Sequence, residues 1–412
     1  MKKKKLYYFL CILVLTFSGS SPLYAGGIDN KQCFSSEYLR TFSRNAATDS
    51  ADAVAYNPAG VMKLDDGLYV NLSVLHIFKE YTNTIDDVDY ASDEPSTIPG
   101  MFGLYRQDRW AIFTAYTIPG GGGMVEYKNG NATTHDIATG IINSSGGAFS
   151  TIKSHYLKSD SYYYGYTMGG ACDLNDMISV SLGARYIDAQ KKSKGLATLS
   201  GVAPDKTYYI NYEENADGWG AFAGINLSLS KKLNIGLKYE TKTKLDFKTK
   251  AHRLDVAVVT DGEKIRRDLP ALLATGISYN FTPDLKAQAS FTYYFEKNAD
   301  WEDRPTTTLD ESKGGNSYDL AVAFEYTFKP RLKGSIGYMY SNTGIKADDM
   351  VPEEPQLDAG TICAGAAYEA IPGLDINIAV MKSFFDKEKT SAGVEYDKDV
   401  FSIALGIQYN FK

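Results

Sequence analysis

Residues 401–412 read FSIALGIQYNFK, and in this stretch apolar side chains alternate with small or polar ones. Successive side chains of a strand point to opposite faces, so the pattern predicts a strand with one apolar and one polar face. Alternation over about ten residues is typical of an outer-membrane β-barrel, whose wall faces lipid on one side and the lumen on the other.

The same alternation recurs along the chain. From Gly67 onward it is complete or nearly so in fourteen segments: 68–82, 96–106, 109–118, 157–173, 176–190, 216–230, 232–247, 268–282, 284–297, 316–329, 331–343, 357–370, 373–386 and 399–412. Bacterial single-chain barrels have an even number of strands. The sequence therefore predicts an all-β protein, with residues 67–412 forming a 14-stranded antiparallel transmembrane β-barrel.

Two kinds of connection separate these segments. Short turns rich in Pro, Gly, Asn and Asp fall at 107–108, 175–176, 230–232, 283–284, 330–331 and 372–373. Longer connections, predicted as loops, fall at 119–156, 191–215, 248–267 and 298–315. Short turns of such barrels are periplasmic, so both chain ends are predicted to be periplasmic. Aromatic residues just before a short turn or the chain end are predicted to form a periplasmic girdle: Tyr279, Phe281, Tyr326, Phe328, Tyr368, Tyr409 and Phe411.

The start of the chain predicts a secretory signal peptide over residues 1–25. A run of lysines at 2–5 precedes an apolar stretch at 6–17 that is too short for a transmembrane helix. Cleavage removes four lysines and changes the net charge from −7 to −11, which argues against nucleic-acid partners. Cys33, Cys172 and Cys363 remain, so at most one disulfide can form, and their spacing fits no metal motif.

Residues 26–66 do not alternate and are predicted to form a small helical hatch, or plug, inside the lumen. Alanines at 46, 47, 51, 53 and 55 favour short helix, while Pro58 disfavours helical geometry at Asn57. Small side chains allow such a segment to fold compactly within a barrel.

The hatch motif and the strand count together resemble the FadL family of outer-membrane transporters for long-chain fatty acids and other hydrophobic compounds. The motif residues are Asp52, Ala53, Asn57, Pro58, Ala59 and Gly60. The segment 116–123, which contains Pro119 and Gly120, is similar to the stretch after the family's third strand. Residues 269–283 are similar to its eighth strand and turn.

The resemblance implies a monomeric, hatch-plugged barrel that takes up apolar molecules passively and releases them sideways near a kinked third strand. Its partners would be hydrophobic cargo, outer-membrane lipid and lipopolysaccharide. The predicted third strand, 109–118, contains no Gly or Pro, so the lateral exit rests on the resemblance. Its mixed parity permits a bulge.

Inward-facing apolar residues support a hydrophobic path independently of the resemblance. The predicted path residues are Leu75, Ile77, Phe222, Met381 and Phe385 on strands, and Phe34, Tyr38, Phe42, Tyr56 and Met62 in the hatch. Packing of hatch against wall is the alternative for each residue taken singly. A fatty-acid carboxylate could bind the inward cations Arg185 and Lys238, which could instead pair with lumen carboxylates such as Glu240 or Glu325.

Enzyme function is not predicted. The four histidines are scattered, no Gly-x-Ser-x-Gly motif occurs, and no catalytic residue, cofactor or metal site is predicted. Uptake of long-chain fatty acids is the favoured function, and uptake of monoaromatic hydrocarbons is the first alternative. A surface-exposed structural or adhesin-like barrel and a hydrophilic porin are alternatives of other classes.

Overall fold

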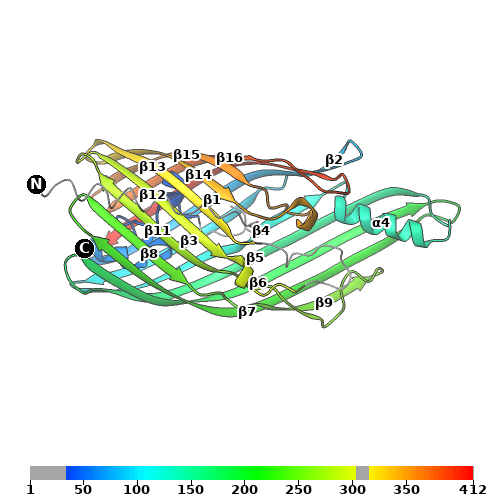
Figure 1. Ribbon diagram of the computed structural model, residues 1–412, viewed down its shortest axis with the longest axis horizontal. Helices are drawn as coiled ribbons and strands as arrows, with labels where there is room; N and C mark the ends of the chain where they lie inside the picture. Colours follow the sequence, from blue (N-terminus) through cyan, green and yellow to red (C-terminus); the bar gives the residue numbers. More distant parts are fainter. Residues whose placement is uncertain (1–33, 303–314, 412) are drawn as a thin grey trace, which may run out of the picture.

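A computed structural model describes residues 34–302 and 315–411. In this part the chain forms a closed antiparallel barrel, in which the first and last strands pair from Leu68 opposite Phe411 to Thr84 opposite Glu395 (Figure 1). The strands that close the barrel are β1 (Gly67–Ile85), β3 (Ser96–Gln107), β4 (Trp110–Tyr127), β5 (Thr151–Asp173), β6 (Ile178–Ser200), β7 (Lys206–Ser228), β8 (Leu233–Glu240), β11 (Ala271–Asn280), β12 (Leu285–Phe295), β13 (Ser317–Lys329), β14 (Leu332–Asn342), β15 (Ala359–Ile371), β16 (Leu374–Phe385) and β18 (Glu395–Phe411).

Shorter elements extend or fill this barrel. The additional strands are β2 (Val88–Ser92), β9 (Asp246–Leu254), β10 (Lys264–Arg266) and β17 (Glu388–Lys389). The helices are α2 (Ser36–Thr41), α3 (Ala53–Tyr56), η2 (Pro58–Lys63), α4 (Ala132–Ser144), η3 (Glu296–Asn298) and η5 (Ala347–Asp349). No helix of the described residues is long and apolar enough to cross a membrane.

The barrel has an apolar outer face, as the alternation predicted. On β13 the outward residues Leu320, Val322 and Phe324 are each about half exposed, whereas the inward residues Ala321 and Ala323 are buried. Large exposed apolar side chains recur on the other barrel strands, and water would disfavour a continuous apolar surface of this size. This confirms the 14-stranded antiparallel transmembrane barrel.

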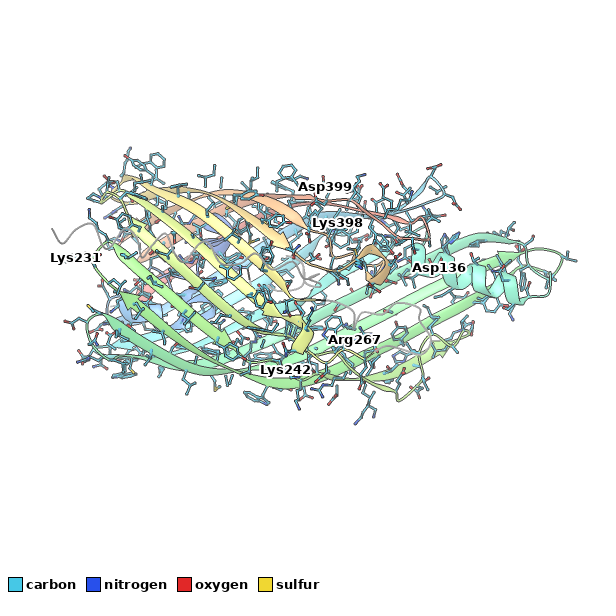
Figure 2. The ribbon with its side chains drawn as sticks, viewed as in Figure 1. Asp136, Lys231, Lys242, Arg267, Lys398 and Asp399 are labelled. Atoms are coloured by element: carbon cyan, nitrogen blue, oxygen red, sulfur yellow. The ribbon has the colours of Figure 1, made fainter. Side chains whose placement is uncertain are left out.

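The six short turns occur where the sequence predicted them, at the end of the barrel where β18 finishes. The predicted girdle residues lie near these turns or at the end of β18; Phe281 and Phe328, for example, are 54% and 63% exposed. Lys231, in the β7–β8 turn, and Asp136, in α4, lie toward opposite ends of the molecule (Figure 2).

The predicted long loops are wrong over much of their length. The segment 191–215 is mostly strand, and 119–156 contains the end of β4, the helix α4 and the start of β5, because β4 to β7 are longer than a membrane crossing requires and α4 lies at their far end (Figure 1). A strand of 23 residues spans roughly 75 Å. Strand segments outside lipid do not need an apolar outer face, so the β5–β6 ladder continues where alternation ends. The segment 248–267 contains most of β9 and all of β10, and 298–315 lies largely outside the described residues.

The predicted end of the third strand at Ile118 is also wrong. β4 continues through Pro119 and Gly123 to Tyr127, and its pairing with β5 shifts register twice, between Thr117 and Gly120 and between Gly120 and Gly123. Gly121 and Gly123 have φ of 83° and 78°, values that residues with a side chain rarely adopt. The irregular strand therefore contains the glycine run at 120–123, which was predicted as part of a loop.

The described part of the hatch, residues 34–66, lies inside the barrel. Its first half passes five inward-facing glycines of the wall, which we call the hatch-seating glycines. A Cβ atom on any of them would overlap the hatch. The wall glycines and the hatch residues they face are Gly236 and Gly276 (Asn45), Gly337 (Thr41), Gly365 (Arg40) and Gly406 (Ser36).

Buried ion pairs hold the same half of the hatch. Arg40 pairs with Glu325 of β13, and Arg44 pairs with Asp52 within the hatch. Arg44 also pairs with Asp49 at 2.6 Å, and Asp49 pairs with Lys286 of β12 at 3.2 Å. The hatch is therefore attached to the wall by charge as well as by close backbone packing.

Candidate functional site

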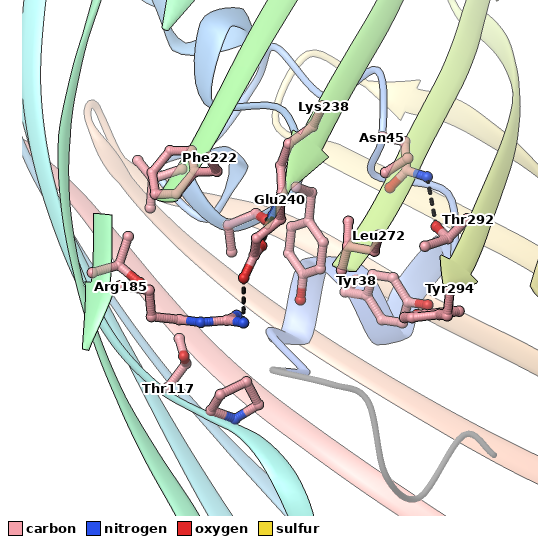
Figure 3. A pocket seen from close by; sticks show the side chains of 16 residues that line it. Tyr38, Asn45, Thr117, Arg185, Phe222, Lys238, Glu240, Leu272, Thr292 and Tyr294 are labelled. Atoms are coloured by element: carbon pink, nitrogen blue, oxygen red, sulfur yellow. Dashed lines mark hydrogen bonds and ion pairs between the residues drawn. The ribbon is translucent and has the colours of Figure 1, made fainter. Parts of the chain in front are cut away.

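An inner cavity of about 70 Å³ lies between the hatch and strands β4 to β12 (Figure 3). Its aromatic lining comes from Tyr38 and Tyr56 of the hatch, Phe222 of β7 and Tyr294 of β12. The rings of Tyr38 and Tyr56 stack with centroids 5.0 Å apart. Three of the predicted path residues therefore meet at one cavity.

Both predicted cations line this cavity. Arg185 of β6 and Lys238 of β8 each pair with Glu240, Lys238 at 3.0 Å (Figure 3). Lys238 Nζ also donates a 2.7 Å hydrogen bond to the carbonyl of Ala55 in the hatch. Two cations share one carboxylate, so the cluster carries net positive charge in a site largely shielded from water.

A side cavity of about 30 Å³ lies beside Phe34, the first described residue of the hatch. The predicted path residues Phe34, Ile77 and Met381 line it, together with Ile118 of β4 and Lys79 of β1. Most of this lining is apolar, and Lys79 supplies a cation. The predicted path is thus divided between two small cavities.

The irregular part of β4 lies between these cavities. Thr117 and Pro119 line the inner cavity, whereas Ile118, Gly121 and Gly122 line the side cavity. β3 and β4 pair only from Met101 opposite Tyr116 to Gln107 opposite Trp110, so the rest of β4 has no ladder with β3. The sheet is least regular in the segment of β4 that lines both cavities.

The hatch-motif residues hold the described part of the hatch together and attach it to the wall. Asp52 accepts hydrogen bonds from Arg44 and, at 2.6 Å, from Ser35 Oγ. Asn57 Nδ2 donates to the carbonyl of Ala47 at 2.9 Å and to Asn226 Oδ1 of β7 at 2.8 Å. The α3 helix starts at Ala53, and Pro58 and Ala59 start η2, where a Cβ on Gly60 would overlap the carbonyl of Ala47.

The other predicted path residues line neither cavity. Phe42 and Leu75 are buried in the cluster that joins the hatch to the wall, and Phe385 packs at its edge. Met62 is buried in a second cluster beside β3 and β4.

Sequence reasoning missed several lining residues. Thr117 and Pro119 were assigned to a strand end and a loop, because a broken register removes the alternation that marks a strand. Leu272 also lines the inner cavity. Lys79 shares the inward parity of Leu75 and Ile77, so parity could have identified it as a lumen residue.

The barrel and hatch resemble solved structures. The Pseudomonas putida toluene transporter TodX matches with a TM-score of 0.68 at 13% identity, over 94% of this chain and 100% of that chain. A Pseudomonas aeruginosa FadL homologue matches with 0.65 at 15%, over 95% and 100%, and the Ralstonia pickettii toluene transporter TbuX with 0.66 at 15%, over 93% and 100%. This chain has the TodX and FadL fold. The resemblance stated from the sequence is confirmed at the level of that fold.

No protein-family model matches the sequence, and no curated protein matches it. Cys172 and Cys363 are free thiols, and Cys33 lies outside the described residues. Among the described residues, no group of three or more His, Cys, Asp or Glu is arranged to hold a metal ion.

Proposed function

We propose that this protein is a passive outer-membrane channel for the uptake of hydrophobic molecules, with long-chain fatty acids as its favoured cargo. The observation that carries the proposal is the inner cavity, which combines aromatic side chains with a cationic cluster behind a hatch. A water-filled porin has a polar lumen. Apolar cargo gains about 0.8 kcal/mol per methylene buried, so an apolar path favours its transfer.

Arg185 and Lys238 are the proposed partners of the cargo carboxylate. The net positive charge of their cluster with Glu240 favours an anion, which would accept charge-assisted hydrogen bonds there. Lys238 also contacts the hatch backbone, so cargo that draws its ammonium group away would loosen one attachment of the hatch. The path residues Phe34, Tyr38, Phe42, Tyr56, Met62, Leu75, Ile77, Phe222, Met381 and Phe385 are proposed to contact or frame the apolar tail.

Passage requires the inner cavity to widen. An engineered protein cavity of about 150 Å³ binds benzene, which is roughly twice the volume available here. Tyr38 and Tyr56 of the hatch line the cavity, so we propose that their movement widens it. The irregular β4 and its missing ladder with β3 support a lateral exit into the membrane at this part of the wall.

We further propose the cellular setting. Residues 1–25 would be a cleaved signal peptide, residues 26–66 the complete hatch, and both chain ends would be periplasmic. The protein would act as a monomer surrounded by outer-membrane lipid and lipopolysaccharide, without a cofactor or catalytic activity.

Monoaromatic hydrocarbons are the second candidate cargo. The stacked tyrosines support it, because aromatic rings favour offset or edge contacts with one another. Two of the similar structures are toluene transporters, a property of those proteins.

Uptake of labelled oleate and labelled toluene distinguishes the candidates. The assay uses cells that lack their own hydrophobic transporter, with and without this protein in the outer membrane. Oleate uptake above the empty-vector control supports the favoured cargo, and toluene uptake alone supports the second candidate. Uptake of neither would overturn the proposed function.

Deletion of residues 26–66 tests the surface-protein alternative. A transporter without its hatch would lose selective uptake or leak, whereas an adhesin-like barrel would bind its target unchanged. High single-channel conductance of the intact protein would instead indicate a hydrophilic porin.

A further inference from the structure

The connection between β14 and β15, residues 343–358, lies at the end of these strands away from the short turns (Figure 1), and its Glu354 contacts Gly122, which lines the side cavity. We call this connection the lid loop. Asn83 Nδ2 donates to the carbonyl of Pro352 at 3.0 Å, and Tyr127 Oη donates to that of Glu353 at 3.0 Å. Buried side chains of barrel strands therefore hold the lid loop by hydrogen bonds to its backbone carbonyl groups.

Two buried lysines lie beneath the lid loop. Lys79 of β1 and Lys398 of β18 are 6% and 5% exposed, and their ammonium groups lie 5.0 and 4.2 Å from the ring centre of Tyr81 (Figure 2 labels Lys398). Lysine is seldom buried, because moving its charge out of water is costly. Lys398 Nζ donates to the carbonyl of Pro355 at 2.8 Å, so the lid loop itself supplies one compensating contact.

The lid loop also brings a carboxylate to this place. Glu354 lies directly against Gly122 of β4, and a Cβ on Gly122 would overlap its carboxylate. The carbonyl of the same glycine accepts a 2.6 Å hydrogen bond from Lys79 Nζ. The carboxylate of Glu354, the backbone of Gly122 and the ammonium group of Lys79 therefore lie close together beside the apolar side cavity.

We propose that the side cavity and the two lysines above it form a capture site for the carboxylate and proximal tail of an amphipathic anion, and that Glu354 occupies the carboxylate position until cargo displaces it. The inference rests on the proposed function and deepens it. It differs from the inner cavity in its residues: Lys79 and Lys398 bind the carboxylate here, and Phe34, Ile77 and Met381 line a cavity of about 30 Å³ that has to widen to accept the tail. Because the irregular part of β4 lines both cavities, cargo captured here lies next to the route inward.

The test is equilibrium binding of radiolabelled oleate to the purified full-length mature protein in detergent. Methyl oleate, which has the same tail without a carboxylate charge, is the comparison probe. Glu354→Gln removes the competing charge and is expected to raise oleate affinity about tenfold while leaving methyl oleate unchanged. Lys79→Met combined with Lys398→Met is expected to lower oleate affinity about tenfold.

Lys387→Met, at an exposed lysine of the β16–β17 connection, is the matched control and should bind oleate like the wild type. The mobility of each unheated variant in gel electrophoresis reports whether the barrel has folded. If the double lysine variant does not fold, Glu354→Gln decides the result. Unchanged oleate affinity in Glu354→Gln would overturn the capture site.

Oleate uptake by the wild type separates the two levels of proposal. If the wild type imports oleate and Glu354→Gln binds it as the wild type does, only the capture site fails. If the wild type takes up neither oleate nor toluene, the proposed function fails and the capture site fails with it.

Discussion

Glycines have different structural roles in two regions of this barrel. The hatch-seating glycines lie in strands whose ladders remain in register around them, and their missing side chains make room for the hatch. In β4 the glycines at 120–123 coincide with two register shifts, and two of them have positive φ. One region uses glycine for close packing and the other for an irregular backbone.

The difference suggests a division of labour within the wall. The strands that seat the first half of the hatch also provide its buried charge partners, Glu325 and Lys286. β4 provides residues to both cavities and loses its ladder with β3. A firmly held hatch opposite an irregular strand would favour movement at β4 over release of the whole hatch.

The largest effect is a loss of stability expected from Arg44→Met, which removes the ion pairs of Arg44 with Asp49 and Asp52 in the hatch. The substitution leaves Asp52 buried without its ion-pair partner, and removal of one member of a buried pair costs about 3–5 kcal/mol. Urea unfolding in detergent measures the free energy of unfolding. Arg253→Met, at an exposed pair, is the control, and equal stability of both variants would contradict the buried attachment.

Gly236→Val tests the seating itself. The new side chain would overlap the carbonyl of Asn45, and overpacking of this kind costs about 1–3 kcal/mol. The hatch should become susceptible to added protease while the barrel stays folded. Gly103→Val is the control, because a Cβ there meets only the Thr114 methyl group at 3.3 Å. A protected hatch in Gly236→Val would show that the close contact is unimportant.

Gly121→Ala tests the irregular segment of β4. An alanine at φ 83° costs about 1–2 kcal/mol and its Cβ would press on the carbonyl of Ser161, so the irregular segment should shift. Oleate uptake is expected to fall several-fold while hatch protection from protease is unchanged. Gly393→Ala, at φ 92° in an open loop, imposes similar strain elsewhere and should transport normally. If the hatch of Gly121→Ala became susceptible to protease, the glycines of β4 and the hatch-seating glycines would not have separate roles.

The smallest expected effect is a pH dependence in the stability of the seated lid loop. Burial raises the pKa of Glu353, and Asn131 and Thr133 at the start of α4 offset this only in part. A raised carboxyl pKa means that the seated loop binds the proton more tightly than the open loop. The seated state is therefore most stable in acid, below the ordinary carboxyl pKa, and loses stability as the pH rises through the raised pKa.

Hydrogen-exchange protection factors over residues 343–358 check this expectation, because they correct for the intrinsic effect of pH on exchange. Protection should fall between pH 4 and pH 8 in the wild type. Glu353→Gln should remove the difference. A wild-type loop that gains protection with rising pH would reverse the sign and reject the assignment.

The transmembrane part of each strand was predictable because lipid and lumen impose opposite requirements on alternate residues. Residues 316–329, for example, were predicted within one residue at the start and at the observed end of β13. β6 was predicted to end at Gln190 but continues to Ser200, because its outer part has no lipid to face. Parity also identified Arg185 and Lys238 as inward-facing, while their common partner Glu240 was only one of two carboxylates considered.

The sequence by itself determined the barrel class, the number of strands and the face on which each transmembrane side chain lies, since these follow from a period of two repeated along the chain. Only the tertiary structure decided which glycines seat the hatch, that the glycine run belongs to β4, and that Glu354 meets Gly122 beside Lys79. These features depend on contacts between residues far apart in the chain, and local alternation carries no information about such contacts.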